Sequence, residues 1–129
     1  MRVDGYRESW QVADDNDLDA ALGFRDDQGG ALFWLVPDEA DYPTLAIRVS
    51  GDLADICYFP QDGHPGFRVL KSVGPPEGGM TTLVYRGCDP ASGEVTHNEF
   101  IVPFETAHAV AKEFFRSRQM SEAVSWFEL

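Results

Sequence analysis

The residues of this chain that could carry chemistry are three histidines, two cysteines and a large excess of carboxylates. The tripeptide His97-Asn98-Glu99 matches the H-x-E half of a zinc nucleobase-deaminase site, in which the histidine binds zinc and the glutamate transfers protons. The other half of such a site is a P-C-x-x-C segment, but no cysteine follows Glu99 in this chain. Cys57 and Cys88 both precede it and stand 31 positions apart, so the sequence does not predict a deaminase.

The remaining motifs predict neither a metal site nor a cofactor site. His64, His97 and His108 fall in an expected loop, an expected strand and an exposed helix face, which gives no zinc-ligand spacing. The chain lacks the G-x-S-x-G turn of a nucleophilic serine and the Lys-Ser/Thr ending of a phosphate-binding loop. A Ser/His/Asp triad stays open as an alternative, because its members meet in space rather than in sequence. We therefore expect a protein that is not an enzyme and holds no metal or cofactor.

Acidic residues dominate the charge of the chain. It has 22 acidic and 10 basic residues, a net charge of −12, and residues 1–41 alone hold 11 acidic residues against three basic ones. Such a surface repels nucleic-acid phosphates and speeds the capture of a basic protein; the alternative role of the charge is solubility. No apolar run reaches the about 18 residues of a membrane span, and residues 1–10 lack the apolar core of a signal peptide. We expect a cytoplasmic protein that binds neither nucleic acid nor membranes.

The hydrophobic pattern predicts a single α+β domain spanning residues 1–129. We expect a largely antiparallel sheet of about six strands, with an N-terminal and a C-terminal helix packed on it. The continuous apolar run 31–36 indicates a buried strand. The candidate strand segments are 6–12, 31–36, 44–50, 53–59, 67–73 and a hairpin of 80–87 with 94–103.

Two helices are expected to pack on this sheet. The first has Asp15 or Asn16 as its N-cap and is ended by a pair of glycines at 29–30. The second spans residues 105–118, where small and aromatic residues recur at helical spacing. Its apolar stripe consists of Ala107, Val110, Ala111, Phe114 and Phe115. This spacing directs both phenylalanines into the core.

The end of the chain, VPFETAHAVAKEFFRSRQMSEAVSWFEL, resembles the end of a family of bacterial immunity proteins. These proteins protect toxin-producing cells from their own polymorphic toxins. The family pattern is a helix with an aromatic pair, a basic step and a Trp near the finish, here Phe114, Phe115, Arg118 and Trp126. Where relatives commonly have a Pro after the basic residue, this chain has Gln119-Met120. The segment DYPTLAIRVSGDLADICYFPQDGHPGF is similar to the family's central hairpin, so the resemblance covers about residues 30–129.

The resemblance implies a cytoplasmic α+β protein without catalysis that occludes a cognate toxin domain in a one-to-one complex. The family includes proteins that counter deaminase toxins acting on nucleic acid. A nucleic-acid (cytosine) deaminase is therefore the first candidate for the toxin, and a nuclease or another toxin is the second. A toxin that acts on nucleic acid presents a basic cleft, which an acidic protein can fill.

We expect the toxin to contact exposed polar loops rather than the closing helix, since loops on a rigid scaffold commonly carry recognition. The candidate contact residues are Asp14, Asp15, Asp17, Asp19, Asp38, Glu39, Asp41, Tyr58, Asp62 and His64. For any single carboxylate among them, the alternative interpretation is a solvated surface charge. Phe114, Phe115 and Trp126 are expected to form the structural core instead.

Two other functions stay open. A small ligand-binding or enzymatic α+β domain would have a pocket beside Tyr58, His64 and Tyr85, with polar groups converging on it. A structural module of a larger assembly would expose a broad apolar patch in place of an acidic one. The depth of any cavity and the character of the largest exposed patch distinguish these functions from toxin binding.

Overall fold

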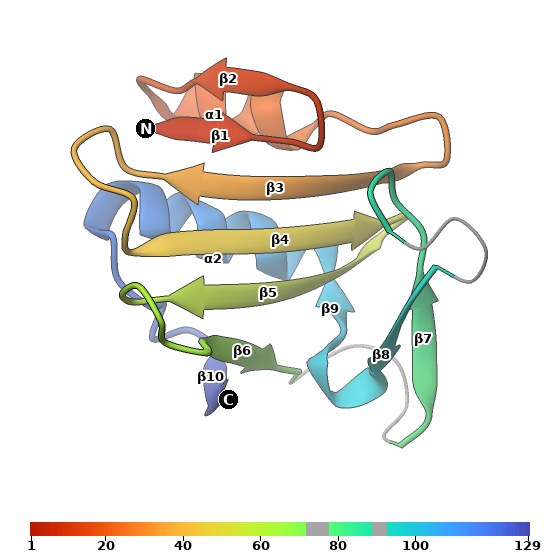
Figure 1. Cartoon of the computed structure of the whole chain (residues 1–129). Helices are drawn as coiled ribbons and strands as arrows, with labels where there is room; N and C mark the ends of the chain where they lie inside the picture. The colour runs from red at the N-terminus through yellow and green to blue at the C-terminus, as the bar shows by residue number, and fades with distance from the viewer. Residues whose placement is uncertain (72–77, 89–92) are drawn as a thin grey trace.

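A computed structural model describes residues 1–71, 78–88 and 93–129 of the chain. Its main element is an eight-stranded antiparallel sheet with the strand order β10-β6-β5-β4-β3-β1-β2, to which β9 is added by pairing with β5. Strands β7 and β8 form a separate two-stranded sheet, and both α-helices lie behind the main sheet in Figure 1. The elements are β1 (Arg2–Asp4), β2 (Ser9–Gln11), α1 (Asp15–Leu22), β3 (Gly30–Val36), β4 (Thr44–Ser50), β5 (Leu53–Phe59), β6 (Phe67–Leu70), β7 (Met80–Leu83), β8 (Glu94–His97), the 3-10 helix η1 (Asn98–Phe100), β9 (Val102–Pro103), α2 (Phe104–Ser117) and β10 (Ser125–Glu128).

The predicted class, an α+β fold with two helices packed on a largely antiparallel sheet, is confirmed. The described residues form ten strands rather than about six. The additional ones are short: β1, β9 and β10 have 3, 2 and 4 residues. Segments of this length contain too few residues to show a hydrophobic period. The long strands β3, β4 and β5 coincide with their predicted segments to within one residue.

Several predicted segments differ in extent. The first predicted strand is reduced to β2, because residues 5–8 turn the chain between β1 and β2. The segment predicted as strand 94–103 breaks after His97 into η1, and its end, β9, pairs with β5. Strand β6 ends at Leu70, and residues 72–73 of its predicted segment lie outside the described residues.

Helix α1 begins and ends elsewhere than predicted. Its N-cap is Asp14, one residue before the first predicted candidate, and the Asp14 carboxylate accepts a hydrogen bond from the N–H of Asp17 at 2.9 Å. The Asp17 carboxylate accepts in return from the N–H of Ala13 at 2.9 Å. Two carboxylates thus satisfy two backbone donors in the manner of a capping box. The helix ends at Gly23, well before the predicted glycine pair.

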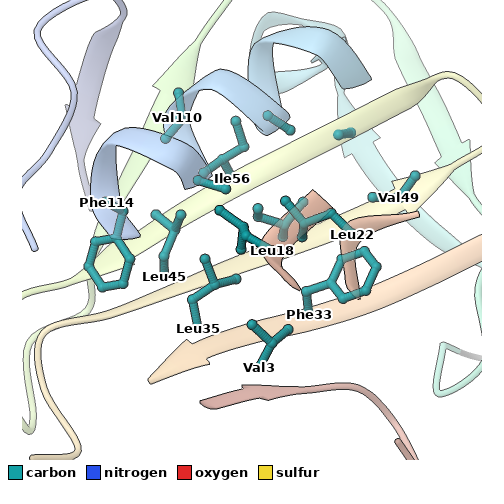
Figure 2. Close-up of a cluster of buried hydrophobic side chains, with 14 of the residues drawn as sticks. Val3, Leu18, Leu22, Phe33, Leu35, Leu45, Val49, Ile56, Val110 and Phe114 are labelled. Atoms are coloured by element: carbon teal, nitrogen blue, oxygen red, sulfur yellow. The ribbon is translucent and has the colours of Figure 1, made fainter. Parts of the chain in front are cut away.

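The hydrophobic core fills the space between the sheet and the two helices. Figure 2 shows Phe33 and Ile56 of the sheet together with Leu18 of α1 and Phe114 of α2. All four side chains are fully buried, and each contributes about 1.5–3 kcal/mol through removal of its apolar surface from water. Phe115 is half-buried and packs against the margin of this core. The core therefore holds both helices on one face of the sheet.

Side chains alternate along a strand, so the residues between the core positions point to the opposite face of the sheet. We call this the front face; it is turned toward the viewer in Figure 1. At one end it is covered by a second apolar cluster, in which Leu83, Tyr85 and Ile101 pack against Leu32 and Leu53. In the described structure, neither α-helix covers the remainder of the front face.

The C-terminal tail forms β10, an edge strand paired with β6. Trp126 points to the helix side, where its ring centroid lies 6.1 Å from that of Tyr58. Its Nε1–H donates a hydrogen bond to the carbonyl of Ser121 at 2.9 Å. Phe127 points to the front face and keeps 48% of its surface exposed. Two neighbouring aromatic residues therefore have different environments, the first against the core and the second at the surface.

Replacing Trp126 by Ala should lower the free energy of unfolding by about 2 kcal/mol or more, because a packed ring and a hydrogen bond are lost. The matched control, Phe127→Ala, should lower it by less than about 1 kcal/mol. Urea denaturation followed by far-ultraviolet circular dichroism gives both values. Equal losses would contradict the assignment of the two rings to opposite faces of β10.

Candidate interaction surface

A row of directly paired residues crosses the front face from β1 to β10. Residues opposite each other on antiparallel strands carry their side chains on the same face. The row consists of Asp4, Trp34, Ala46, Cys57, Arg68 and Phe127. On one side of this row, the paired residues Arg48 and Asp55 lie between the row and the second apolar cluster. On the other side, Val36 and Thr44 lead toward a groove.

Trp34 and Phe59 form an aromatic ridge on this face. Their ring centroids lie 6.0 Å apart with an angle of 25° between the planes, so the rings stack. Trp34 nevertheless keeps 38% of its surface exposed. A large aromatic side chain that is held rigidly yet accessible is typical of the residues that dominate protein interfaces.

A groove of about 440 Å³ opens beside Trp34. Its walls come from β1, β3 and β4, from the loop before β4 and from the loop after β5. The lining residues are Arg2, Asp4, Trp34, Val36, Asp41, Tyr42, Thr44 and Asp62. Three of these carry a carboxylate and one carries a guanidinium, so the groove has a net charge of −2.

Two carboxylates of the groove have no counter-ion among the described residues. Arg2 donates to Asp4 at 2.8 Å, and these two charges compensate each other. Asp41 and Asp62 are exposed and form no ion pair with any residue of the described ranges. Both belong to the predicted contact set, and the structure brings them into one groove from separate loops. The groove is therefore negatively charged and has aromatic walls, which include the 37% exposed Tyr42.

A buried carboxylate elsewhere on the front face holds two arginines. Asp55 is 1% exposed and forms ion pairs with Arg48 and Arg68. Arg48 also pairs with Glu94 of β8 at 2.8 Å. The guanidinium of Arg68 lies over the ring of Phe100, 4.3 Å from its centroid. Burial opposes the charge of Arg48, but the hydrogen bond and the negative charge of Asp55 raise the pKa of Arg48 above its ordinary value. These charges are engaged within the fold.

The predicted contact residues of α1 have structural roles on the helix side. They are Asp14, Asp15, Asp17 and Asp19. Asp14 and Asp17 form the N-terminal cap. Asp15 pairs with Arg116 at 2.6 Å and Asp19 with His108 at 2.6 Å, so both acids join α1 to α2. The structure does not bring these four residues to the groove.

Asp38 and Glu39, two further predicted contact residues, also have partners within the chain. Asp38 accepts hydrogen bonds from the amine of Met1 at 2.7 Å and from the side chain of Gln11 at 3.0 Å. The hydrogen bond from Gln11, together with that from the amine, lowers the pKa of Asp38. Glu39 lies 3.9 Å from the guanidinium of Arg118. Both acids belong to the same loop as Asp41, between β3 and β4, but do not line the groove themselves.

Tyr58 is a core residue, which corrects its predicted role as a contact. It is 8% exposed, its hydroxyl donates to the carbonyl of Arg118 at 3.2 Å, and its ring lies 6.1 Å from that of Phe114. The physical reason is the alternation of β5, which turns Tyr58 toward the helices and its neighbours Cys57 and Phe59 toward the front face.

The pocket expected beside Tyr58, His64 and Tyr85 is not formed by these three residues. Tyr58 packs in the core, whereas Tyr85 belongs to the second apolar cluster on the front face. His64 stacks on Phe67 at 5.0 Å and pairs with Glu128 of β10 at 3.1 Å. Tyr85 lines a different groove, of about 490 Å³, beside the turn between β1 and β2.

Sequence reasoning misses Trp34, Tyr42 and Phe59 as surface residues. A continuous apolar run indicates a buried strand but does not separate the two faces of that strand. The signal that identifies Trp34 is alternation: once Phe33 and Leu35 are placed in the core, Trp34 must face the other way. The stacking with Phe59 depends on the pairing of β3, β4 and β5, which no local pattern encodes.

Comparison with known proteins adds no relative to this description. No protein-family model matches the chain, and no curated protein matches it significantly. In the described part of the chain, neither α1 nor α2 has the length and apolar character needed to cross a membrane. Within residues 1–71, 78–88 and 93–129, no group of three or more histidine, cysteine, aspartate or glutamate side chains is arranged to hold a metal ion. The function is therefore inferred from the chain's own surface.

Cys57, in the middle of the front-face row, should be a poor nucleophile. Burial and the nearby charge of Asp55 raise the pKa of its thiol to about 11, so the reactive thiolate is scarce at pH near 8. In a Cys88→Ser background, iodoacetamide should alkylate Cys57 at least about tenfold more slowly in the folded protein than in urea. Mass spectrometry measures both rates. Equal rates would show that the thiol is accessible and active, and would favour an enzymatic role for this face.

Proposed function

We propose that this chain is a non-catalytic binding protein of the bacterial immunity type, which occludes a basic toxin domain with the front face of its sheet. The observation that carries the proposal is the combination, on one face, of the exposed Trp34 ridge with the unpaired carboxylates Asp41 and Asp62. Protein interfaces concentrate their binding energy in a few aromatic residues surrounded by a polar rim. The front face has this composition.

The charge of the chain supports a basic partner. A net charge of −12 attracts a positively charged domain over a distance of about a Debye length and raises the rate of encounter. At contact, Asp41 and Asp62 supply two local charges that have no counter-ion within residues 1–71, 78–88 and 93–129. A toxin domain that binds nucleic acid carries the complementary positive surface, because it must hold phosphates.

The chemistry of the front face favours contact over catalysis. Its buried carboxylate, Asp55, is bonded to two arginines. Burial also raises the pKa of Cys57 and so disfavours the thiolate. An aromatic ridge beside uncompensated carboxylates can hold a partner surface and keep substrate from it.

The proposal extends to the setting in which the protein acts. An immunity protein must meet its toxin inside the producing cell, so we place it in the cytoplasm, in a one-to-one complex. A nucleic-acid deaminase is the first candidate for the toxin and a nuclease is the second. Escape of even a small fraction of free toxin would harm the cell, so we expect tight binding. The colicin–immunity pairs are among the tightest known complexes.

Co-expression with the toxin domain encoded beside this gene tests the proposal. The wild-type chain should relieve toxicity and co-purify with the domain in a one-to-one ratio. Trp34→Arg, which places a positive charge on the front face, should weaken binding at least tenfold, about the loss of one interface hot spot. The matched control, Ala109→Arg, adds the same charge at an exposed position of α2 and should bind as the wild type does.

Thermal unfolding of each variant verifies that binding losses do not come from unfolding. Failure of the wild-type chain to relieve toxicity would refute the proposed function. If the wild type and Trp34→Arg both relieve toxicity but Ala109→Arg does not, the interface lies on the helix side.

A further inference from the structure

The groove beside Trp34 combines negative charge with aromatic side chains, and these two properties restrict the kind of ligand that it can bind. Its Arg2–Asp4 pair, at 2.8 Å, is internally compensated, which leaves Asp41 and Asp62. These two residues come from different loops, one before β4 and one after β5, and line the same groove. Both carboxylates are therefore available to a cation that enters the groove.

Aromatic rings supply the rest of the recognition. Trp34 is fixed by its stacking on Phe59, and Trp34 and Tyr42 both line the groove with a large exposed fraction. A planar guanidinium stacks on aromatic rings and offers five N–H donors that match carboxylate geometry. An ammonium is a compact and more strongly hydrated charge, and it gains less from a flat ring. Rings and carboxylates together favour arginine over lysine.

One guanidinium, that of Arg2, is already part of the groove wall, where it forms an ion pair with Asp4. The groove's volume of about 440 Å³ falls within the range typical of sites that take a small molecule. This volume leaves room for an arginine side chain, and Val36 is the aliphatic residue of the lining that its alkyl stem could contact.

From these observations we infer that the partner inserts an arginine side chain into this groove, where the guanidinium bridges Asp41 and Asp62 and stacks on Trp34. The inference rests on the proposed function, because it specifies the chemistry by which the front face recognises its partner. The matching feature on the partner is an arginine that protrudes from its basic surface.

Two peptides of equal charge, acetyl-Gly-Arg-Gly-amide and acetyl-Gly-Lys-Gly-amide, serve as probes. Each is titrated into the nitrogen-15-labelled full chain at fixed ionic strength. The indole N–H signal of Trp34, assigned with a Trp34→Phe variant, reports binding by NMR. We expect a saturable shift with the arginine peptide and at least about threefold weaker binding of the lysine peptide.

The variants separate the groove from the general negative charge. Asp41→Asn/Asp62→Asn should bind the arginine peptide at least about tenfold more weakly, because the charge-assisted hydrogen bonds are lost. Glu122→Gln removes an exposed carboxylate outside the groove and should leave binding unchanged. Circular dichroism verifies folding, and Asp62→Asn alone replaces the double variant if that variant does not fold.

Three results would overturn the inference: equal shifts from both peptides, a shift that the Asn variant retains, or no saturable shift at about 10 mM arginine peptide. The toxin domain distinguishes this failure from that of the proposed function. If the Asn variant binds and neutralises the toxin as the wild type does, the inference fails and the function stands. If the arginine peptide binds the groove but the wild-type chain does not neutralise the toxin, the function fails and the groove's chemistry stands.

Discussion

The buried carboxylate of Asp55 is the interaction on which the front face depends. A carboxylate that is 1% exposed costs several kcal/mol to bury unless it is paired, so Arg48 and Arg68 are held beside it on neighbouring strands. Arg48 then reaches Glu94 and joins the β7–β8 sheet to the main sheet. Because these charges compensate one another, that end of the front face is structural. Asp41 and Asp62, which have no counter-ion among the described residues, line the groove beside Trp34.

The acidic residues of the chain fall into two groups that the net charge alone does not separate. Asp15 pairs with Arg116 and Asp19 with His108, and these contacts join α1 to α2. Exposed pairs of this kind contribute about 0–1 kcal/mol each, so they orient the helices more than they stabilise them. Asp41 and Asp62 have no such partners within the described ranges and stay accessible to another molecule. Steering by the total charge and recognition by a few carboxylates are therefore distinct properties.

The sequence predicts the long elements well, because β3, β4, β5 and α2 each carry an apolar pattern longer than one period. It does not predict β1 or β10, whose few residues become strands only by pairing with other segments, nor the break that separates β9 from β8. The same limit applies to the site. Loop composition indicates Asp41 and Asp62, but whether a carboxylate is already paired depends on tertiary contacts. For this reason the sequence does not separate Asp15 and Asp19 from Asp41 and Asp62. The face occupied by Trp34 or Tyr58 follows from the alternation of side chains only once the neighbouring residues are placed in the core.

In the proposed complex, the front face, rather than the helix side, covers the partner. Hydroxyl-radical footprinting of the chain, free and bound to the proposed toxin partner, measures the exposure of individual side chains on both sides. Coverage of the front face predicts that oxidation of Trp34, Tyr42 and Phe127 falls on binding while that of Phe115 on α2 does not change. Unchanged oxidation of Trp34 and Tyr42, together with protection of Phe115, would contradict it.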